Sequence, residues 1–351
     1  MIQSVATLVA ARQVQRDVER LQARQSTLGH EIATGNKADI SGELGGRTPI
    51  LIGLRDAHAR TERYLETSAT LATRLETMQL ALSGIRDAGG QLGLEALAAV
   101  GRSDVTSLRN VQTSAEAALD LVVRHLNSTV AGRHLFSGTL VDTAPMVGGA
   151  GPAGVIDAVI ADAAAAAGGQ IDVADVAGLV ADLDAVFADS HPDPTRQFST
   201  AFYQGAPATE PDLTGQLDEG ARMTYGLKAN DDGFRDVMQG LHMLAAVRFG
   251  DPGMTEQAYR DFAEAAVDRL HRGLDRLIDV AAQTGQNQAR VATNQDRLQA
   301  ALDLYNREIV ELERRDPYEA ATLLTTVQQQ LEASFLITAR MSQLSLTSYL
   351  R

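Results

Sequence analysis

The sequence predicts a mainly helical protein, in which the N- and C-terminal segments form a long antiparallel helical bundle or coiled coil around a small α+β insert. Two observations lead to this fold class. Six of the nine prolines fall between Pro145 and Pro211, and residues 50–144 and 253–316 contain none. Because proline breaks the interior of a helix, these two stretches are free to form long helices. In both stretches apolar residues recur at alternating spacings of three and four, which is typical of helices that pack at a shallow angle.

The composition excludes several classes of protein. A chain of 351 residues, 44% of them apolar, is long enough to bury a sizeable core and too apolar for wholesale disorder. Aromatic residues make up only 4% and Trp is absent, which is typical of long helical assemblies built from Ala, Leu and Val. The absence of Cys excludes disulfides, thiolate nucleophiles and Cys-ligated metals. No apolar run approaches the roughly 18 residues of a membrane span, so we expect no membrane insertion.

The charge is acidic and unevenly distributed. The net charge of −14 comes from 31 basic and 45 acidic residues. We therefore expect no nucleic-acid partner, because such binding depends on Lys and Arg at phosphates. Residues 155–232 hold 14 acidic and three basic residues. We expect this middle part to be a solvated surface and the flanking parts to pack or assemble.

The first part of the chain divides into three helical segments. The first segment ends at Thr34-Gly35-Asn36, where glycine supplies the left-handed conformation that closes many helices. A polar, Gly-rich loop over residues 37–49 follows. Gly101-Arg-Ser-Asp104 separates the second segment from the third, with Ser103 or Asp104 as the expected N-cap.

The apolar seams of these helices are imperfect, since Gln25, Ser68 and Ala72 occupy seam positions. A core that is complete within one chain seldom accepts so many polar or small residues. We therefore favour helices that finish their packing against neighbouring subunits, with a loosely specified bundle within one chain as the alternative.

The middle of the chain has a different character. The glycines of Gly148–Gly154 predict a flexible linker. Val173–Phe187 is expected to be one amphipathic helix. Aromatic and β-branched residues at alternating positions predict strands over Gln197–Gly205 and Ala221–Ala229. The helical pattern resumes near Gly233. The domain organisation we expect is an N-terminal assembly helix and loop (1–48), the N-terminal half of the bundle (49–140), an exposed acidic α+β insert (141–230), the C-terminal half of the bundle (231–315) and a C-terminal assembly helix (316–351).

The stretch AGRHLFSGT, residues 131–139, is the strongest candidate for chemistry, because it holds a histidine and a serine between glycines. The nucleophile elbow is G-x-S-x-G between a strand and a helix. Around Ser137, Leu135 and Thr139 stand where the two glycines should be, and the preceding segment is helical. We therefore expect no catalytic serine. Ser137 is instead interpreted as a turn hydroxyl that bonds nearby backbone.

No other pattern supports catalysis, a cofactor or a metal. None of the seven histidines has a partner at i, i+4, and no H-E-x-x-H motif exists. Phosphate-binding glycine loops are absent as well. Asp231-Asp232 and the Asp-rich residues 182–193 lack the spacing of a calcium loop. The sequence therefore predicts no catalytic residue, no cofactor site and no metal site, and the protein is not expected to be an enzyme.

Several motifs carry a resemblance to a known family. GRHLFSGT closes a proline-free helix and is followed by Asp142-Thr-Ala-Pro145; Leu28–Gly35 (LGHEIATG) ends the first helix; Ala221–Ala245 leads back into the helices; and Asp316–Leu350 ends in LSLTSYL. Together these stretches resemble the bacterial flagellin superfamily. Met146 replaces the Phe usual in the family, and the loop Lys37–Gly46 lacks its acidic motif. The insert is matched only loosely.

Within this superfamily the chain looks most like the hook-associated junction proteins. Flagellins typically end in a sequence like NVLSLLR, whereas this chain ends in QLSLTSYLR. The resemblance implies a structural protein that connects hook to filament through coiled-coil assembly of its terminal helices; a flagellin or flagellin-like filament subunit is the alternative. It also implies an extracellular location in the flagellum, reached through the flagellar export channel without a cleaved signal peptide. The implied partners are hook-associated protein 1, flagellin, copies of the chain itself and an export chaperone.

The resemblance also assigns residues to roles. The terminal helices are expected to order on assembly rather than in the free chain. The expected turn at the boundary between bundle and insert consists of Gly132, Leu135, Phe136 and Gly138. The expected subunit-interface residues are Leu21, Leu28, Ile32, Leu302, Ile309, Val327, Leu331, Leu344, Leu346 and Leu350.

Overall fold

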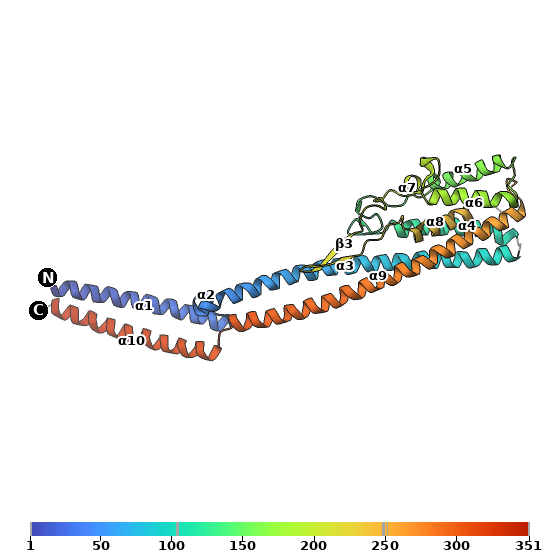
Figure 1. Ribbon diagram of the computed structural model, residues 1–351. Coiled ribbons are helices and arrows are strands. Elements are labelled where there is room, and N and C mark those ends of the chain that lie inside the picture. The colour runs from blue at the N-terminus through green and yellow to red at the C-terminus, as the bar shows by residue number, and fades with distance from the viewer. Residues whose placement is uncertain (1, 103–104, 248–249, 251, 350–351) are drawn as a thin grey trace. The chain divides into compact units, whose positions relative to one another are not determined.

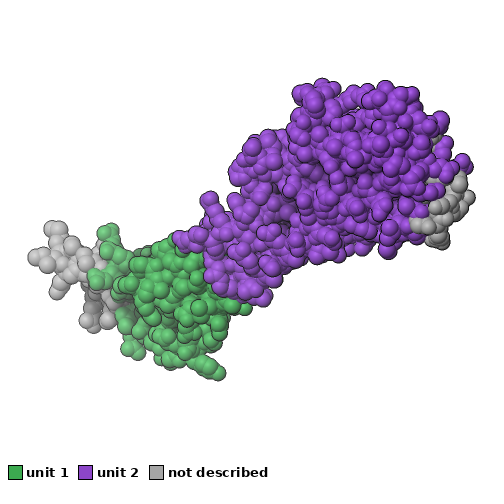
Figure 2. Space-filling model, turned by 45° about the vertical axis from the view of Figure 1, so that its right-hand side comes forward, with its two compact units in different colours: residues 1–62, 299–351 green, residues 63–298 purple. Residues whose placement is uncertain are grey.

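The computed structural model describes residues 2–102, 105–247, 250 and 252–349. Within these ranges the side chains of residues 2–11, 101–102, 105–106, 108 and 341–349 are left undescribed. The contacts divide the chain into two compact units (Figure 2). Unit 1 consists of residues 1–62 and 299–351, and unit 2 consists of residues 63–298.

The described elements are mainly helices, with two short hairpins (Figure 1). The predicted fold class, long terminal helices around a small α+β insert, is confirmed. In chain order the elements are α1 (Ile2–Thr34), α2 (Ile40–Leu44), η1 (Gly45–Arg47), α3 (Thr48–Arg102), α4 (Val105–Leu126), β1 (Thr129–Val130), β2 (Arg133–His134), α5 (Ala150–Ala166), α6 (Val173–Phe187), η2 (Pro194–Arg196), α7 (Phe198–Ala201), β3 (Thr214–Asp218), β4 (Ala221–Thr224), α8 (Asp232–Ala246), α9 (Glu256–Glu313) and α10 (Pro317–Tyr349).

In unit 2, α3 and α9 run antiparallel. Gly89 faces Leu274, whereas Ser68, nearer the start of α3, accepts a hydrogen bond from Asn294 at 3.3 Å, nearer the end of α9. Asn294 also donates to the carbonyl of Leu217 in β3 at 2.9 Å. Both Ser68 and Asn294 are buried, and these bonds satisfy them. The buried pair of Ser68 and Asn294 thus ties the β3–β4 hairpin to α3 and α9.

Helix α8 packs closely against α9 because both helices carry a glycine at the crossing. A Cβ on Gly240 would lie 2.7 Å from the carbonyl oxygen of Ala266, and a Cβ on Gly273 would lie 2.6 Å from the backbone nitrogen of Val237. Only a hydrogen side chain permits this approach of one backbone to the other. On its other side α8 contacts α4 and α5, so it lies at the centre of the unit 2 core.

The insert is held to α8 by an aromatic cluster of Phe187, Phe198, Phe202 and His242. The ring centroids of Phe187 and Phe202 lie 5.1 Å apart, and those of Phe202 and His242 lie 5.2 Å apart. The rings of Phe198 and Phe202 stack at 5.6 Å. Arg235 of α8 covers the Phe198 ring, with its guanidinium carbon 4.9 Å from the ring centroid.

Three predictions for the insert can be compared with the structure. The helix Val173–Phe187 is confirmed as α6, and a capping box between Asp172 and Asp175 fixes its start. The strand predicted over Gln197–Gly205 is wrong, since this stretch contains the short helix α7, whose turn directs Phe198 and Phe202 into the core. Of the strand predicted over Ala221–Ala229, only β4 forms.

The linker predicted over Gly148–Gly154 is also shorter than expected. Helix α5 begins at Ala150 and includes Gly151 and Gly154. Glycine disfavours a helix by up to about 1 kcal/mol per residue, but burial of Pro152, Ile156 and Val159 holds this one in place. The predicted N-cap at Ser103 or Asp104 lies outside the described residues.

The glycine crossing predicts a specific loss of stability. Gly240→Ala should lower the free energy of unfolding of unit 2 by about 2 kcal/mol, because its methyl group meets backbone atoms that cannot move aside. Gly90→Ala in α3 is the matched control, since a Cβ there meets open space; it should stabilise by about 0.5–1 kcal/mol. Urea unfolding measures both, and a Gly240→Ala protein as stable as the wild type contradicts the crossing.

His242 predicts a dependence on pH. Burial lowers the pKa of His242 from 6.5 to about 4. As the pH falls, the histidine of the unfolded chain therefore takes up a proton at a higher pH than that of the folded chain. The contribution of the neutral ring is complete above about pH 6.5 and decreases toward pH 4, and the free energy of unfolding should fall by about 2 kcal/mol between pH 7 and 5. His242→Phe should remove this component in urea titrations at several pH values. An unchanged pH profile in His242→Phe contradicts the assignment.

Candidate assembly surface

Unit 1 is built on the pairing of α1 with α10, which lie side by side (Figure 1). Gly35, after α1, meets Arg315, before α10, and the two helices therefore run antiparallel. Among the described side chains, Leu28, Val327 and Leu331 form the buried core of this pair. Val18, Leu21, Leu323 and Leu324 pack against it and stay partly exposed. Over the described side chains of the pair, residues 12–34 of α1 and 317–340 of α10, this core is small.

The predicted interface residues divide into three groups. The structure of the single chain buries Leu28, Leu302, Val327 and Leu331. Leu21 and Ile309 are half-buried, and Ile32 is exposed. Leu344 and Leu346 lie in α10 with undescribed side chains, and Leu350 lies outside the described residues.

Other apolar side chains of unit 1 are more exposed than those predicted. Phe335, Leu336 and Ile337 are consecutive in α10, and each exposes more than half of its surface. Because successive residues of a helix point in different directions, three apolar neighbours cannot all face α1. These three consecutive apolar residues are visible in the sequence, and they could have indicated an exposed apolar surface on this helix. The exposed apolar residues of unit 1 are Ile32, Ile50, Ile52, Leu304, Val310, Tyr318, Phe335, Leu336 and Ile337, and we call them the outer apolar set.

A joint connects the ends of α1 and α9 with the start of α10. Gly35 has a φ of 74°, which closes α1 with a left-handed residue as the sequence predicts. The nitrogen of Arg315 donates to the carbonyl of Gly35 at 2.8 Å, and the nitrogen of Lys37 donates to the carbonyl of Glu313 at 2.9 Å. Two segments far apart in sequence thus pair through their backbones.

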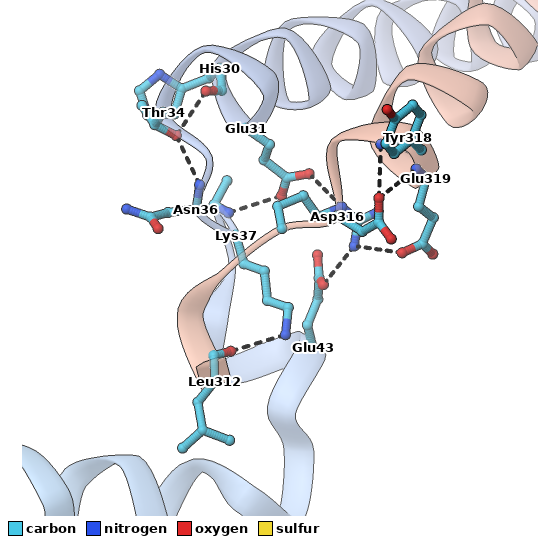
Figure 3. A network of polar contacts seen from close by, with 12 residues as sticks. His30, Glu31, Thr34, Asn36, Lys37, Glu43, Leu312, Asp316, Tyr318 and Glu319 are labelled. Carbon is cyan, nitrogen blue, oxygen red and sulfur yellow. Dashed lines mark hydrogen bonds and ion pairs between the residues drawn. The ribbon is translucent and has the colours of Figure 1, made fainter. Parts of the chain in front are cut away.

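Arg315 is the central side chain of this joint, and Figure 3 shows its carboxylate partners Glu31, Glu43 and Glu319. It lies 3.4 Å from a carboxylate oxygen of Glu31, 3.0 Å from Glu43 and 3.9 Å from Glu319. Glu31 is only 3% exposed, and its other carboxylate oxygen accepts a hydrogen bond from the backbone nitrogen of Ala38 at 2.9 Å. A buried carboxylate needs such partners, because desolvation otherwise disfavours its charge. Arg315 therefore links α1, α2 and α10 through one cation.

Further polar contacts fix the two loops of the joint. Lys37, one of the two lysines in the chain, donates from Nζ to the carbonyl of Leu312 at 3.0 Å, at the end of α9. The Asp316 carboxylate accepts from the backbone nitrogens of Tyr318 and Glu319 at 2.8 and 3.3 Å, which satisfies amides in the first turn of α10. Arg55 of α3 pairs with Glu313 at 2.6 Å.

The predicted boundary turn lies in unit 2 and is buried from Leu135 to Gly138, whereas Gly132 is exposed. Gly132 and Gly138 both have positive φ values, of 75° and 65°. Leu135 and Phe136 are buried, and the Phe136 ring meets Phe234 of α8 edge-on at 5.7 Å. Phe136 also accepts a backbone hydrogen bond from Ala229 at 2.8 Å. The turn thus joins the end of α4 to the residues that precede α8.

One prediction for this turn is wrong. The hydroxyl of Ser137 is buried and has no hydrogen-bond partner among the described residues, although it was expected to bond nearby backbone. The backbone of Ser137 instead forms a bridge with Lys228 and accepts a hydrogen bond from Ala206 at 2.8 Å. These two backbone contacts fix the position of the residue.

A comparison with protein-family models finds a match in the C-terminal helices. The model of the bacterial flagellin C-terminal helical region matches residues 267–350, which include most of α9 and α10. Residues 267–350 are thus similar to the flagellin C-terminal helical region. The resemblance found in the sequence is thereby confirmed for these residues. Flagellin-family proteins are structural and not enzymatic. No curated protein sequence matches the chain.

The chain is also similar to solved structures. A protein of Vibrio parahaemolyticus named as a flagellar hook-associated protein is 14% identical, and the match covers 77% of this chain and 99% of that one with a TM-score of 0.52. The structure of Bacillus cereus FlgL is 12% identical, and the match covers 74% and 98% of the two chains with a TM-score of 0.49. At these identities the first likeness establishes a shared fold.

Two further observations concern metal binding and membrane-spanning helices. Among the described residues, no three His, Cys, Asp or Glu side chains are grouped so that they could hold a metal ion. No described helix is both long enough and apolar enough to cross a membrane.

The joint predicts that substitution of Arg315 has a strong effect on stability. Arg315→Met should destabilise unit 1 by about 3 kcal/mol, because it leaves Glu31 buried without its cation. The double variant Glu31→Gln with Arg315→Met should recover much of the loss, and Arg307→Met, on the exposed face of α9, should have little effect. Urea unfolding measures all three. A double variant no more stable than Arg315→Met contradicts the role of the ion pair.

Proposed function

We propose that the chain is a structural protein of the bacterial flagellum of the hook-associated type, and that it connects hook to filament through its terminal helices. The observation that carries this proposal is the antiparallel α1–α10 pair. It joins both ends of the chain, includes part of the flagellin region, and keeps a small core beneath an exposed apolar surface. The fold shared with the hook-associated protein of Vibrio parahaemolyticus supports the same role.

The proposed assembly follows from the way in which the α1–α10 pair is packed. A helix in a protein owes most of its stability to the packing of its apolar face. The buried core of Leu28, Val327 and Leu331 covers little of that need, whereas the outer apolar set is available to subunits beside it. An interface that repeats head to tail between identical subunits generates rings or helical tubes. In the proposed organisation, residues 1–48 and 316–351 assemble, 49–140 and 231–315 form the bundle, and 141–230 are the exposed insert.

The proposed partners are copies of the chain, hook-associated protein 1 and flagellin, with an export chaperone before assembly. The proposed location is the outside of the cell, after passage through the flagellar export channel without a cleaved signal peptide. A filament subunit is the second candidate function, because the matching family model is that of flagellin itself.

A seeding assay separates the two candidates. Purified protein is mixed with sheared flagellar filament seeds, and filament length is followed by electron microscopy. A junction protein should add a limited cap and stop. Continued elongation of the seeds overturns the junction role in favour of the filament subunit.

The outer apolar set predicts which substitutions abolish assembly. Leu336→Glu should leave the helix content and the unfolding free energy of the free protein within about 0.5 kcal/mol of wild type, because the side chain is 64% exposed. It should prevent cap formation, since a charge would be buried at the interface. Deletion of residues 342–351 should have the same effect.

The matched control is Gln329→Glu, which adds the same charge at an exposed polar position of the same helix. It should assemble like wild type. Normal caps from Leu336→Glu, or equal loss of caps in both variants, contradict an interface at the outer apolar set.

A further inference from the structure

A groove in unit 2, away from the terminal helices, has the features of a binding site. It lies between α4, the start of α5 and the end of α8 and has a volume of about 470 Å³. Leu119, Val123 and Ala245, which are partly exposed, contribute apolar surface to it. This volume falls within the range of roughly 300–1,000 Å³ that is usual for ligand sites.

The charge around the groove has a single sign. Glu116 and Asp120 line it from α4, and Asp157 lines it from α5, and all three residues are exposed. The lining residues, all of which the structure describes, include no Lys or Arg. No described ion pair involves any of the three carboxylates. The groove therefore carries uncompensated negative charge beside apolar surface.

Unused hydrogen-bonding groups also reach the groove. His242 lines it, is 7% exposed, and its Nε2 atom is buried without a hydrogen-bond partner. Helix α5 begins at the groove with Gly149 as N-cap, and no side chain caps it. The first amides of a helix have no partner within the helix and require acceptors from elsewhere. A buried nitrogen without a partner and an uncapped helix start both call for polar groups of a ligand.

We propose that this groove docks a basic, partly apolar peptide segment of a partner protein. Lys or Arg side chains of the segment complement Glu116, Asp120 and Asp157, and an apolar side chain packs on Leu119 and Val123. The backbone carbonyls of the segment accept from the free amides at the start of α5. A peptide carries all three features, whereas a free amine lacks the carbonyl acceptors. This docking role goes beyond assembly through the terminal helices and does not depend on it.

Fluorescence polarisation of a short labelled peptide of Leu, Ala and Arg, added to the full chain, tests the proposal. The wild-type protein should bind this peptide, and binding should weaken as salt screens the carboxylates. A peptide with Glu in place of Arg should bind at least about tenfold more weakly. Butylguanidinium, a free cation on an apolar stem, should not compete at comparable concentrations.

Variants locate the binding. Glu116→Lys with Asp120→Lys should lower the affinity for the Arg peptide by about tenfold or more, and Ala153→Trp, at an exposed position of the groove wall, should block it sterically. Asp275→Lys, exposed on α9 outside the groove, is the matched charge control and should bind as wild type. Circular dichroism checks that each variant is folded. Unchanged binding in both groove variants, equal binding of the Glu peptide, or equal binding of butylguanidinium overturns the proposal.

Discussion

The contact of Arg315 with Glu31 is the constraint on which the arrangement of the chain ends depends. It brings the end of α1 to the start of α10 at a place where neither helix has a large core. The backbone pairing of Gly35 with Arg315 and of Lys37 with Glu313 repeats the connection without side chains. Because the joint combines these backbone bonds with ion pairs from Arg315 to three carboxylates, it fixes direction and register. The apolar side chains of the helices can then remain on the outside.

This division between a polar joint and an exposed apolar surface accounts for the proposed function. A free protein does not usually keep so many large apolar side chains on one unit, and such surfaces mark interaction sites. Unit 2 is different, since its extensive buried core, the glycine crossing of α8 with α9 and the aromatic cluster make it stable by itself. The chain thus combines a self-sufficient unit with one whose packing is finished by partners.

The sequence predicted the features that have a strong local cause. Proline-free stretches indicated the long helices, the apolar pattern of Val173–Phe187 indicated an amphipathic helix, and Gly35 indicated the end of α1. It failed where tertiary contacts decided the result. Phe198 and Phe202 have a strand-like composition, but the aromatic cluster favours a helical turn. Leu28 and Val327 carried the right pattern for an interface, yet periodicity does not tell whether the covering helix belongs to the same chain.

The central claim is that the terminal helix pair is completed only by neighbouring subunits. Hydrogen exchange, compared between the free protein and assembled caps, measures this most directly. In the free protein, residues 12–34 and 318–340 should exchange faster than the core helices of unit 2. In the caps, both terminal segments should become protected together. Strong and equal protection of these segments in the free protein and in the caps would contradict the account.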